Sequence, residues 1–140
     1  MTWIVDASVA AKWMFEEELT ANARTLIESG RPLVAPDIIF AEVGNVAWKR
    51  VLRGEITAQH ARAAVNALPQ LLSLTVESSH LVYDALDLAL KLKHPVYDCL
   101  YVALAERQDA PLVTDDARLL ERLTGAKWSG SAVALGDLSL

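Results

Sequence analysis

The feature that most constrains the fold of this chain is the alternation of short apolar runs with longer helical patterns. The five short runs are rich in β-branched residues and span residues 2–5, 33–35, 74–76, 111–114 and 132–135. Strands buried on both faces of a parallel sheet have this composition. Helix-period apolar patterns lie between them, at residues 8–15, 20–29, 37–53, 57–72, 79–92, 97–108 and 116–123. The sequence therefore predicts an α/β fold: one three-layer domain over residues 1–140, with a short central parallel sheet flanked by helices.

Residues that start or stop helices support these boundaries. Gly30 and Gly54 follow the second and third helical patterns and are expected to end them. Thr57 is the expected N-cap of the fourth helix, and Pro69 is expected to kink that helix or end it early.

The composition excludes several classes of protein. No apolar run approaches the ~18 residues of a membrane span, and the N-terminus has no basic region of the kind that opens a signal peptide. Cys99 is the only cysteine, so the chain cannot form an internal disulfide or a thiolate metal site. We therefore expect a cytoplasmic protein that is not associated with a membrane.

Two acidic residues stand where structure alone explains them poorly. Asp6 directly follows the first predicted strand, at the sheet edge where parallel α/β folds bind ligands, although it would also be a good helix N-cap. Glu42 lies among apolar neighbours on its helix, with Asn45 one turn further on. Glu42 is either at the edge of a narrow apolar stripe or part of a functional site.

Further acids occur in the second half of the chain. Asp98 begins an otherwise apolar helix, where it could serve as a first-turn acid or as a ligand. Asp115 and Asp116 follow the strand that ends at Thr114, and one of the two is expected to cap the next helix.

Acids gathered at one sheet edge would repel one another and raise one another's pKa. A hard divalent cation removes this penalty, since Mg²⁺ and Mn²⁺ prefer carboxylate oxygen ligands. We therefore expect Asp98 to be paired with a metal ion. A thiol site at Cys99 and His94 is less favoured, because a lone cysteine in an apolar helix is usually inert. The three histidines, His60, His80 and His94, lack zinc-ligand spacing.

The ordered segments IVDASVAAKW, AEVGN, YDCLYVALAE and LVTDDARLL resemble the PIN-domain ribonucleases, and among them the toxins of VapBC-type modules. The resemblance runs from residue 3 to about residue 136. It implies a PIN-like fold and a dimeric, Mg²⁺- or Mn²⁺-dependent endoribonuclease of structured RNA that a partner antitoxin silences.

The resemblance also assigns residues. It implies catalytic acids at Asp6, Glu42, Asp98 and Asp116, of which Asp6, Asp98 and Asp116 would hold the metal. Accessory polar positions would be Ser8, Asn45 and Thr114, with Asp115 as an acid additional to the usual pattern.

The net charge of −5 does not by itself indicate a nucleic-acid partner. Setting aside the four acids assigned to the site leaves 14 acids against 13 bases, so the remaining surface is nearly neutral. A mean hydropathy of +0.24 and four tryptophans also predict apolar surfaces for a homodimer and for a partner helix.

Two other functions remain as alternatives. One is an aspartate-dependent phosphatase or receiver-like domain, but the phosphatase needs a second aspartate at the position of Ser8, and the receiver needs its acidic pair after the first strand. The other is a catalytically silent PIN-shaped binding module, which would normally have lost one of the four acids.

Overall fold

The computed structural model describes residues 1–138, and its centre is a five-stranded, fully parallel sheet. The strands are β1 (Trp3–Val5), β2 (Leu33–Pro36), β3 (Leu74–Val76), β4 (Leu112–Thr114) and β5 (Ala132–Ala134). Their order across the sheet is β3-β2-β1-β4-β5. All five predicted strands are present, and the predicted α/β class is confirmed.

Within residues 1–138 the chain forms seven α-helices. They are α1 (Ala7–Met14), α2 (Thr20–Glu28), α3 (Ile38–Leu52), α4 (Ala58–Leu71), α5 (Val82–Leu92), α6 (Val96–Gln108) and α7 (Ala117–Gly125). Gly30 and Gly54 have φ of +71° and +74° just beyond α2 and α3, where a residue without Cβ is favoured. Pro69 does not end α4 early, since the helix continues to Leu71, close to the expected end at residue 72. No helix in this part of the chain has the length and apolarity that a bilayer crossing requires.

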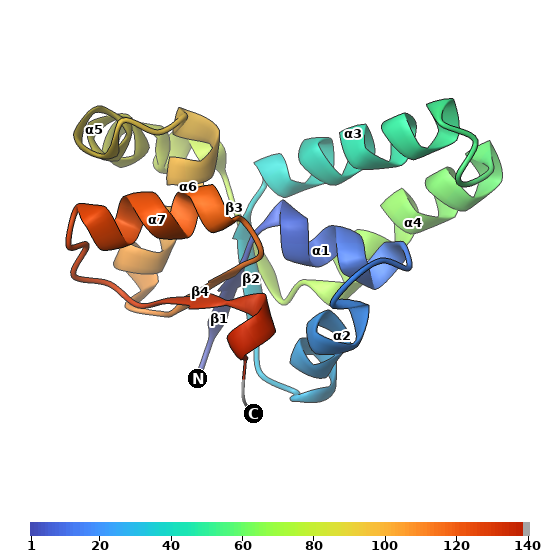
Figure 1. Cartoon of the computed structure of the whole chain (residues 1–140), viewed down its shortest axis with the longest axis horizontal. Helices are drawn as coiled ribbons and strands as arrows, with labels where there is room; N and C mark the ends of the chain where they lie inside the picture. The colour runs from blue at the N-terminus through green and yellow to red at the C-terminus, as the bar shows by residue number, and fades with distance from the viewer. Residues whose placement is uncertain (139–140) are drawn as a thin grey trace.

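The helices cover the sheet in layers (Figure 1). Helix α6 packs against β1, β2 and β4, with α5 against its outer side. Helix α1 contacts β4 and is itself covered by α2 and α3. Figure 1 places α5, α6 and α7 on one side of the sheet and α1 to α4 on the other, which confirms the three-layer arrangement.

The two outer strands differ from the prediction. β3 and β5 were expected to be buried on both faces, but their residues are partly exposed, and Leu74 is 52% exposed. Each has only one neighbouring strand, so an outer strand is covered less completely than β1, β2 and β4.

Helices α3 and α4 form an antiparallel hairpin that extends away from the sheet (Figure 1). A small apolar cluster of Ala11, Phe15, Ala47 and Ala64 joins the hairpin to α1 and to the residue that follows it. This cluster lies apart from the main core, which surrounds the sheet and α6.

The strand order places a topological switch point between β1 and β4. From β1 the chain moves outward through β2 to β3, and then returns to the other side of β1 as β4 and β5. In open parallel sheets, ligands bind beyond the carboxyl ends of the strands at such a point. Asp6 follows β1 there, and Asp115 and Asp116 follow β4.

Candidate active site

Asp6 is held rigidly at the switch point. It is the N-cap of α1, and its Oδ1 accepts hydrogen bonds from the Val9 N–H at 3.2 Å and the Ser8 hydroxyl at 2.6 Å. The Thr114 hydroxyl donates to its Oδ2. Both interpretations of Asp6 from the sequence, helix cap and pocket residue, therefore describe the same side chain.

Burial makes the charged form of Asp6 costly. The pKa of Asp6 is raised to about 6: desolvation raises it most, hydrogen bonds from Ser8, Thr114 and Val9 lower it, and the charge of Asp98 raises it. The carboxylate is thus positioned by several donors, yet still favours a proton or another cation.

Ser8 and Thr114 connect the ends of β1 and β4. Besides donating to Asp6, the Ser8 hydroxyl accepts a hydrogen bond from the Asp115 N–H at 3.0 Å. The Thr114 hydroxyl accepts one from the Asp116 N–H, also at 3.0 Å. The two hydroxyls therefore fix the turn after β4 relative to Asp6.

Glu42 reaches the same pocket from α3. Its Oε1 accepts a hydrogen bond of 2.6 Å from the Tyr101 hydroxyl on α6. Burial raises the pKa of Glu42, the Tyr101 hydrogen bond lowers it, and the charge of Asp98 raises it. Glu42 is half-buried, so it lies at the edge of the apolar stripe and also lines the pocket; Asn45 lines the pocket from the next turn.

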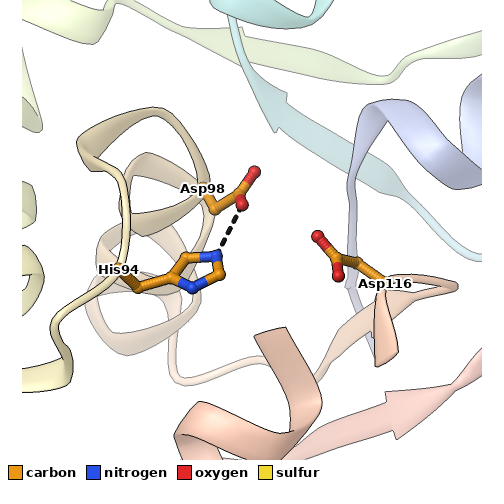
Figure 2. Close-up of side chains that lie close together, drawn as sticks. All are labelled: His94, Asp98 and Asp116. Atoms are coloured by element: carbon orange, nitrogen blue, oxygen red, sulfur yellow. Dashed lines mark hydrogen bonds and ion pairs between the residues drawn. The ribbon is translucent and has the colours of Figure 1, made fainter. Parts of the chain in front are cut away.

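Asp98 has a side-chain partner that was not predicted from the sequence. His94 Nε2 lies 2.6 Å from Asp98 Oδ2, and the His94 ring is buried (Figure 2). His94 was considered only as a thiol partner or zinc ligand, yet its position four residues before Asp98 puts both on one side of the chain at the start of α6. Cys99 is buried, and burial raises the pKa of its thiol to about 11, so no reactive thiolate forms beside it.

The two consecutive acids after β4 have different partners. Asp116 is the N-cap of α7 and accepts from the N–H groups of Arg118 and Leu119 through Oδ1. Asp115 Oδ2 instead lies 3.1 Å from Lys12 Nζ. Lys12 is buried and also pairs with Glu17 at 2.9 Å. Burial lowers the Lys12 pKa, but the bonds to Glu17 and Asp115 raise it above its ordinary value.

These residues line one pocket at the switch point. Its acids are Asp6, Glu17, Glu42, Asp98, Asp115 and Asp116, and Lys12 is the only base among its lining residues. The acids come from β1, α3, α6, the turn after β4 and the loop before α2, so the fold gathers charges that are far apart in the sequence. Such an excess of negative charge favours binding of a cation.

The donor set of this pocket fits a divalent cation. Within residues 1–138, ligand atoms of His94, Asp98 and Asp116 lie within 4.8 Å of one another. The Asp98 and Asp116 carboxylates are directed toward one another from α6 and from the start of α7 (Figure 2). Asp6 lines the same pocket but lies outside this group. Carboxylate oxygens of this kind are suitable ligands for Mg²⁺ or Mn²⁺.

Sequence reasoning missed His94, Tyr101, Lys12 and Glu17. His94 and Tyr101 stand four residues before and three residues after Asp98, a helical spacing that could have identified them. Lys12 is a single base in the apolar segment of α1, which is also a usable signal. Glu17 lies in an acidic loop with no comparable pattern.

The chain matches known proteins over most of its length. The PIN domain family matches residues 3–125. Ribonuclease VapC3 of Pyrobaculum aerophilum is 35% identical over 124 residues, which cover 87% of this chain and 95% of that protein. Ribonuclease VapC1 of Mycobacterium tuberculosis is 42% identical over 98 residues, which span 61% of this chain and 63% of that protein.

Solved structures share the fold at low sequence identity. The PAE2754 protein of Pyrobaculum aerophilum has a TM-score of 0.74 at 21% identity, covering 97% of this chain and 85% of that one. VapBC2 of Rickettsia felis, bound to a DNA fragment of its promoter, gives a TM-score of 0.66 at 11% identity and covers 96% of this chain and 98% of that one. The family match, the Pyrobaculum relative and the parallel fold agree, and the chain belongs to the PIN-domain family, in its VapC group.

Proposed function

We propose that this chain is a metal-dependent endoribonuclease, the toxin of a type II toxin–antitoxin module, that hydrolyses RNA phosphodiester bonds in the cytoplasm. The observation that carries the proposal is the gathering of Asp6, Glu42, Asp98 and Asp116 in one pocket at the topological switch point. The ribonuclease names of its relatives in the VapC group support the same reaction.

Asp6, Asp98 and Asp116 would hold Mg²⁺ or Mn²⁺, with Glu42 acting directly or through a water molecule. When bound, such an ion supplies positive charge near the phosphate and a water of lowered pKa. Asp6 is held immobile for this role by Ser8, Thr114 and the Val9 N–H.

Glu42 is suited to orient the attacking water or to accept its proton, as is Asp116. Burial raises the Glu42 pKa, and the Tyr101 hydroxyl fixes the side chain while leaving Glu42 Oε2 outside that hydrogen bond. In this route water would attack the phosphorus and the 3′-oxygen would leave, so the products would carry a 5′-phosphate and a 3′-hydroxyl. Cyclic phosphates would not form.

The α3–α4 hairpin has an apolar surface that could bind a protein partner. A shallow, largely apolar groove on the α3–α4 hairpin includes Ala47, Trp48, Val51 and Val65. An antitoxin helix would occupy such a groove. Support comes from similar structures that are toxin–antitoxin complexes, among them one from Klebsiella pneumoniae with a TM-score of 0.64. We also propose a homodimer.

The test is the substitution Asp98→Asn, assayed on a labelled structured RNA with Mn²⁺. Asparagine keeps the volume and an oxygen acceptor for His94 but loses the charge. We expect activity to fall at least ~100-fold, because a bound metal ion typically stabilises the transition state of such a reaction by several kcal/mol. The melting temperature should change little.

The matched control is Asp87→Asn, which removes an exposed acid on α5 and should leave cleavage unchanged. EDTA should stop cleavage by the wild type, and Mn²⁺ should restore it. Cleavage that resists EDTA, or full activity of Asp98→Asn, would contradict the proposed function.

A further inference from the structure

We infer that His94 is a positioning residue, which orients the Asp98 carboxylate toward the metal without binding the metal itself. The inference rests on the proposed function, because it assigns a role to His94 at the same site. It is carried by the 2.6 Å hydrogen bond between His94 Nε2 and Asp98 Oδ2 and by the surroundings of the imidazole ring (Figure 2).

The backbone around His94 is fixed on both sides. Lys93 ends α5 in the left-handed conformation at φ +54°, and the His94 N–H closes the turn onto the Ala89 carbonyl at 3.3 Å. Pro95 then begins α6 with its restricted φ, and the Cys99 thiol contacts the His94 carbonyl at 3.8 Å. These contacts fix the turn between α5 and α6, and the turn places the His94 ring beside Asp98.

The two ring nitrogens have different environments, and this difference determines the tautomer. Within residues 1–138, buried His94 Nδ1 has no hydrogen-bond partner, whereas Nε2 faces Asp98. A buried N–H without an acceptor is costly, so the proton belongs on Nε2 and not on Nδ1. Nε2–H then donates to Asp98 Oδ2 and leaves Oδ1 outside that bond.

This hydrogen bond has a specific task in a crowded acidic pocket. The charge of Asp98 raises the pKa of both Asp6 and Glu42, so the three carboxylates repel one another. The Asp98 side chain is 31% exposed, and without an anchor it would turn outward to water. Outer-shell partners of metal ligands typically contribute 10–100-fold to metal affinity.

The alternative is direct ligation, because His94 belongs to the group whose ligand atoms lie within 4.8 Å. In the inferred tautomer, however, Nε2 carries the hydrogen that it donates to Asp98 Oδ2, so it has no free lone pair for a metal ion. Nδ1, which has a free lone pair, is not the nitrogen that faces Asp98. The geometry therefore favours orientation of the carboxylate.

The test compares His94→Gln with His94→Leu, using isothermal titration of the full chain with Mn²⁺ and no RNA. The glutamine amide can donate from nearly the position of Nε2, whereas leucine cannot donate. We expect the leucine variant to bind Mn²⁺ about 10–100-fold more weakly than the wild type, and the glutamine variant to retain most of the affinity. A purely structural role would lower the melting temperature of both variants without separating their affinities. Wild-type affinity in the leucine variant would overturn the inference.

His80→Leu is the control, because His80 is exposed and is not among the residues that line the acidic pocket. Asp98→Asn separates this inference from the proposed function. If Asp98→Asn keeps Mn²⁺ affinity, the proposed metal site is wrong; if only His94→Leu keeps it, the inference about His94 is wrong.

Spectroscopy provides a second readout, which does not depend on the measured Mn²⁺ affinities. In nitrogen NMR of the metal-free wild type, Nε2 of His94 should be the protonated ring nitrogen. Pulsed EPR of the Mn²⁺-loaded protein should show no directly bonded imidazole nitrogen. A strong nitrogen coupling that disappears in His94→Leu would overturn the inference and make His94 a ligand.

Discussion

At the scale of single residues, Asp6 carries the clearest energetic conflict in the molecule. It is buried, and its pKa is raised to about 6 by desolvation despite three hydrogen bonds. An acid whose pKa is higher in the folded state than in the unfolded state binds protons more tightly when folded. Its contribution to stability is therefore complete below pH 4 and is lost as pH rises through about 6.

We predict that the metal-free protein becomes more stable as pH falls from about 7 to about 5. The full contribution of Asp6 across its two pKa values is up to about 3 kcal/mol of unfolding free energy. Urea unfolding in EDTA measures it. Asp6→Asn has no such proton to bind, so its stability should change less over the same interval. Equal pH dependence in both proteins would contradict the assignment.

At the scale of elements, the positions of the helices and strands were predicted from the sequence, but their neighbours in the sheet and some of their boundaries were not. The five strands were identifiable because each is a short apolar run rich in β-branched residues. The order β3-β2-β1-β4-β5 was not predicted, since pairing depends on contacts between distant segments. The expected helix 79–92 is divided into a 3₁₀ turn at Ser78–His80 and α5, because Ser78 bonds to Asp37 at the end of β2.

In the candidate site, too, some features could be predicted from the sequence and others could not. The acids were predicted from their local context, at strand ends or among apolar neighbours. Their partners were not, because the hydrogen bonds of Thr114 to Asp6 and of Tyr101 to Glu42 join residues 108 and 59 positions apart. Local pattern thus indicates which residues are unusual, while the tertiary structure determines what each one contacts.

Helix α7 supplies a further prediction about the RNA. Its residues Arg118 and Arg122 line a pocket with Lys91 of α5, and within residues 1–138 none of the three pairs with a carboxylate. Arg118 is two residues after Asp116, so a strand bound at the acids would pass these bases. We predict that replacing all three with alanine weakens binding of single-stranded RNA and flattens its salt dependence. Each lost phosphate contact changes the log–log slope by about 0.7.

The measurement is fluorescence anisotropy of a labelled RNA in Ca²⁺ over a range of salt concentrations. Hydrolysis of bis(p-nitrophenyl) phosphate with Mn²⁺ should be unchanged, since this small substrate would occupy the acidic pocket, which none of the three bases lines. The matched triple variant is Lys49→Ala, Arg53→Ala and Arg62→Ala on the α3–α4 hairpin. If that variant flattens the slope and the first does not, the RNA lies along the hairpin.

At the scale of the whole molecule, most of the exposed large apolar side chains within residues 1–138 lie in two regions of different shape. One is the groove of the α3–α4 hairpin, with Trp48 58% exposed. The other is α5, where Val82, Leu86 and Leu90 follow one another at intervals of four residues. The two regions lie at opposite ends of the view in Figure 1. A groove suits a partner's helix, whereas a helix face can pack against its own copy across a two-fold axis.

We therefore predict that the homodimer forms through α5. Replacing Leu86 and Leu90 with glutamate would place four carboxylates near the two-fold axis, and would also remove apolar burial that is worth about 1.5–3 kcal/mol per leucine. Light scattering should then show a monomer at high micromolar concentration, while circular dichroism stays unchanged because both side chains are exposed.

The control, Trp48→Glu with Leu52→Glu, alters the hairpin and should leave the dimer intact. If the wild-type protein is itself monomeric at this concentration, the proposed dimer is wrong. If only the hairpin variant dissociates the dimer, the interface is formed by α3 and α4 and not by α5.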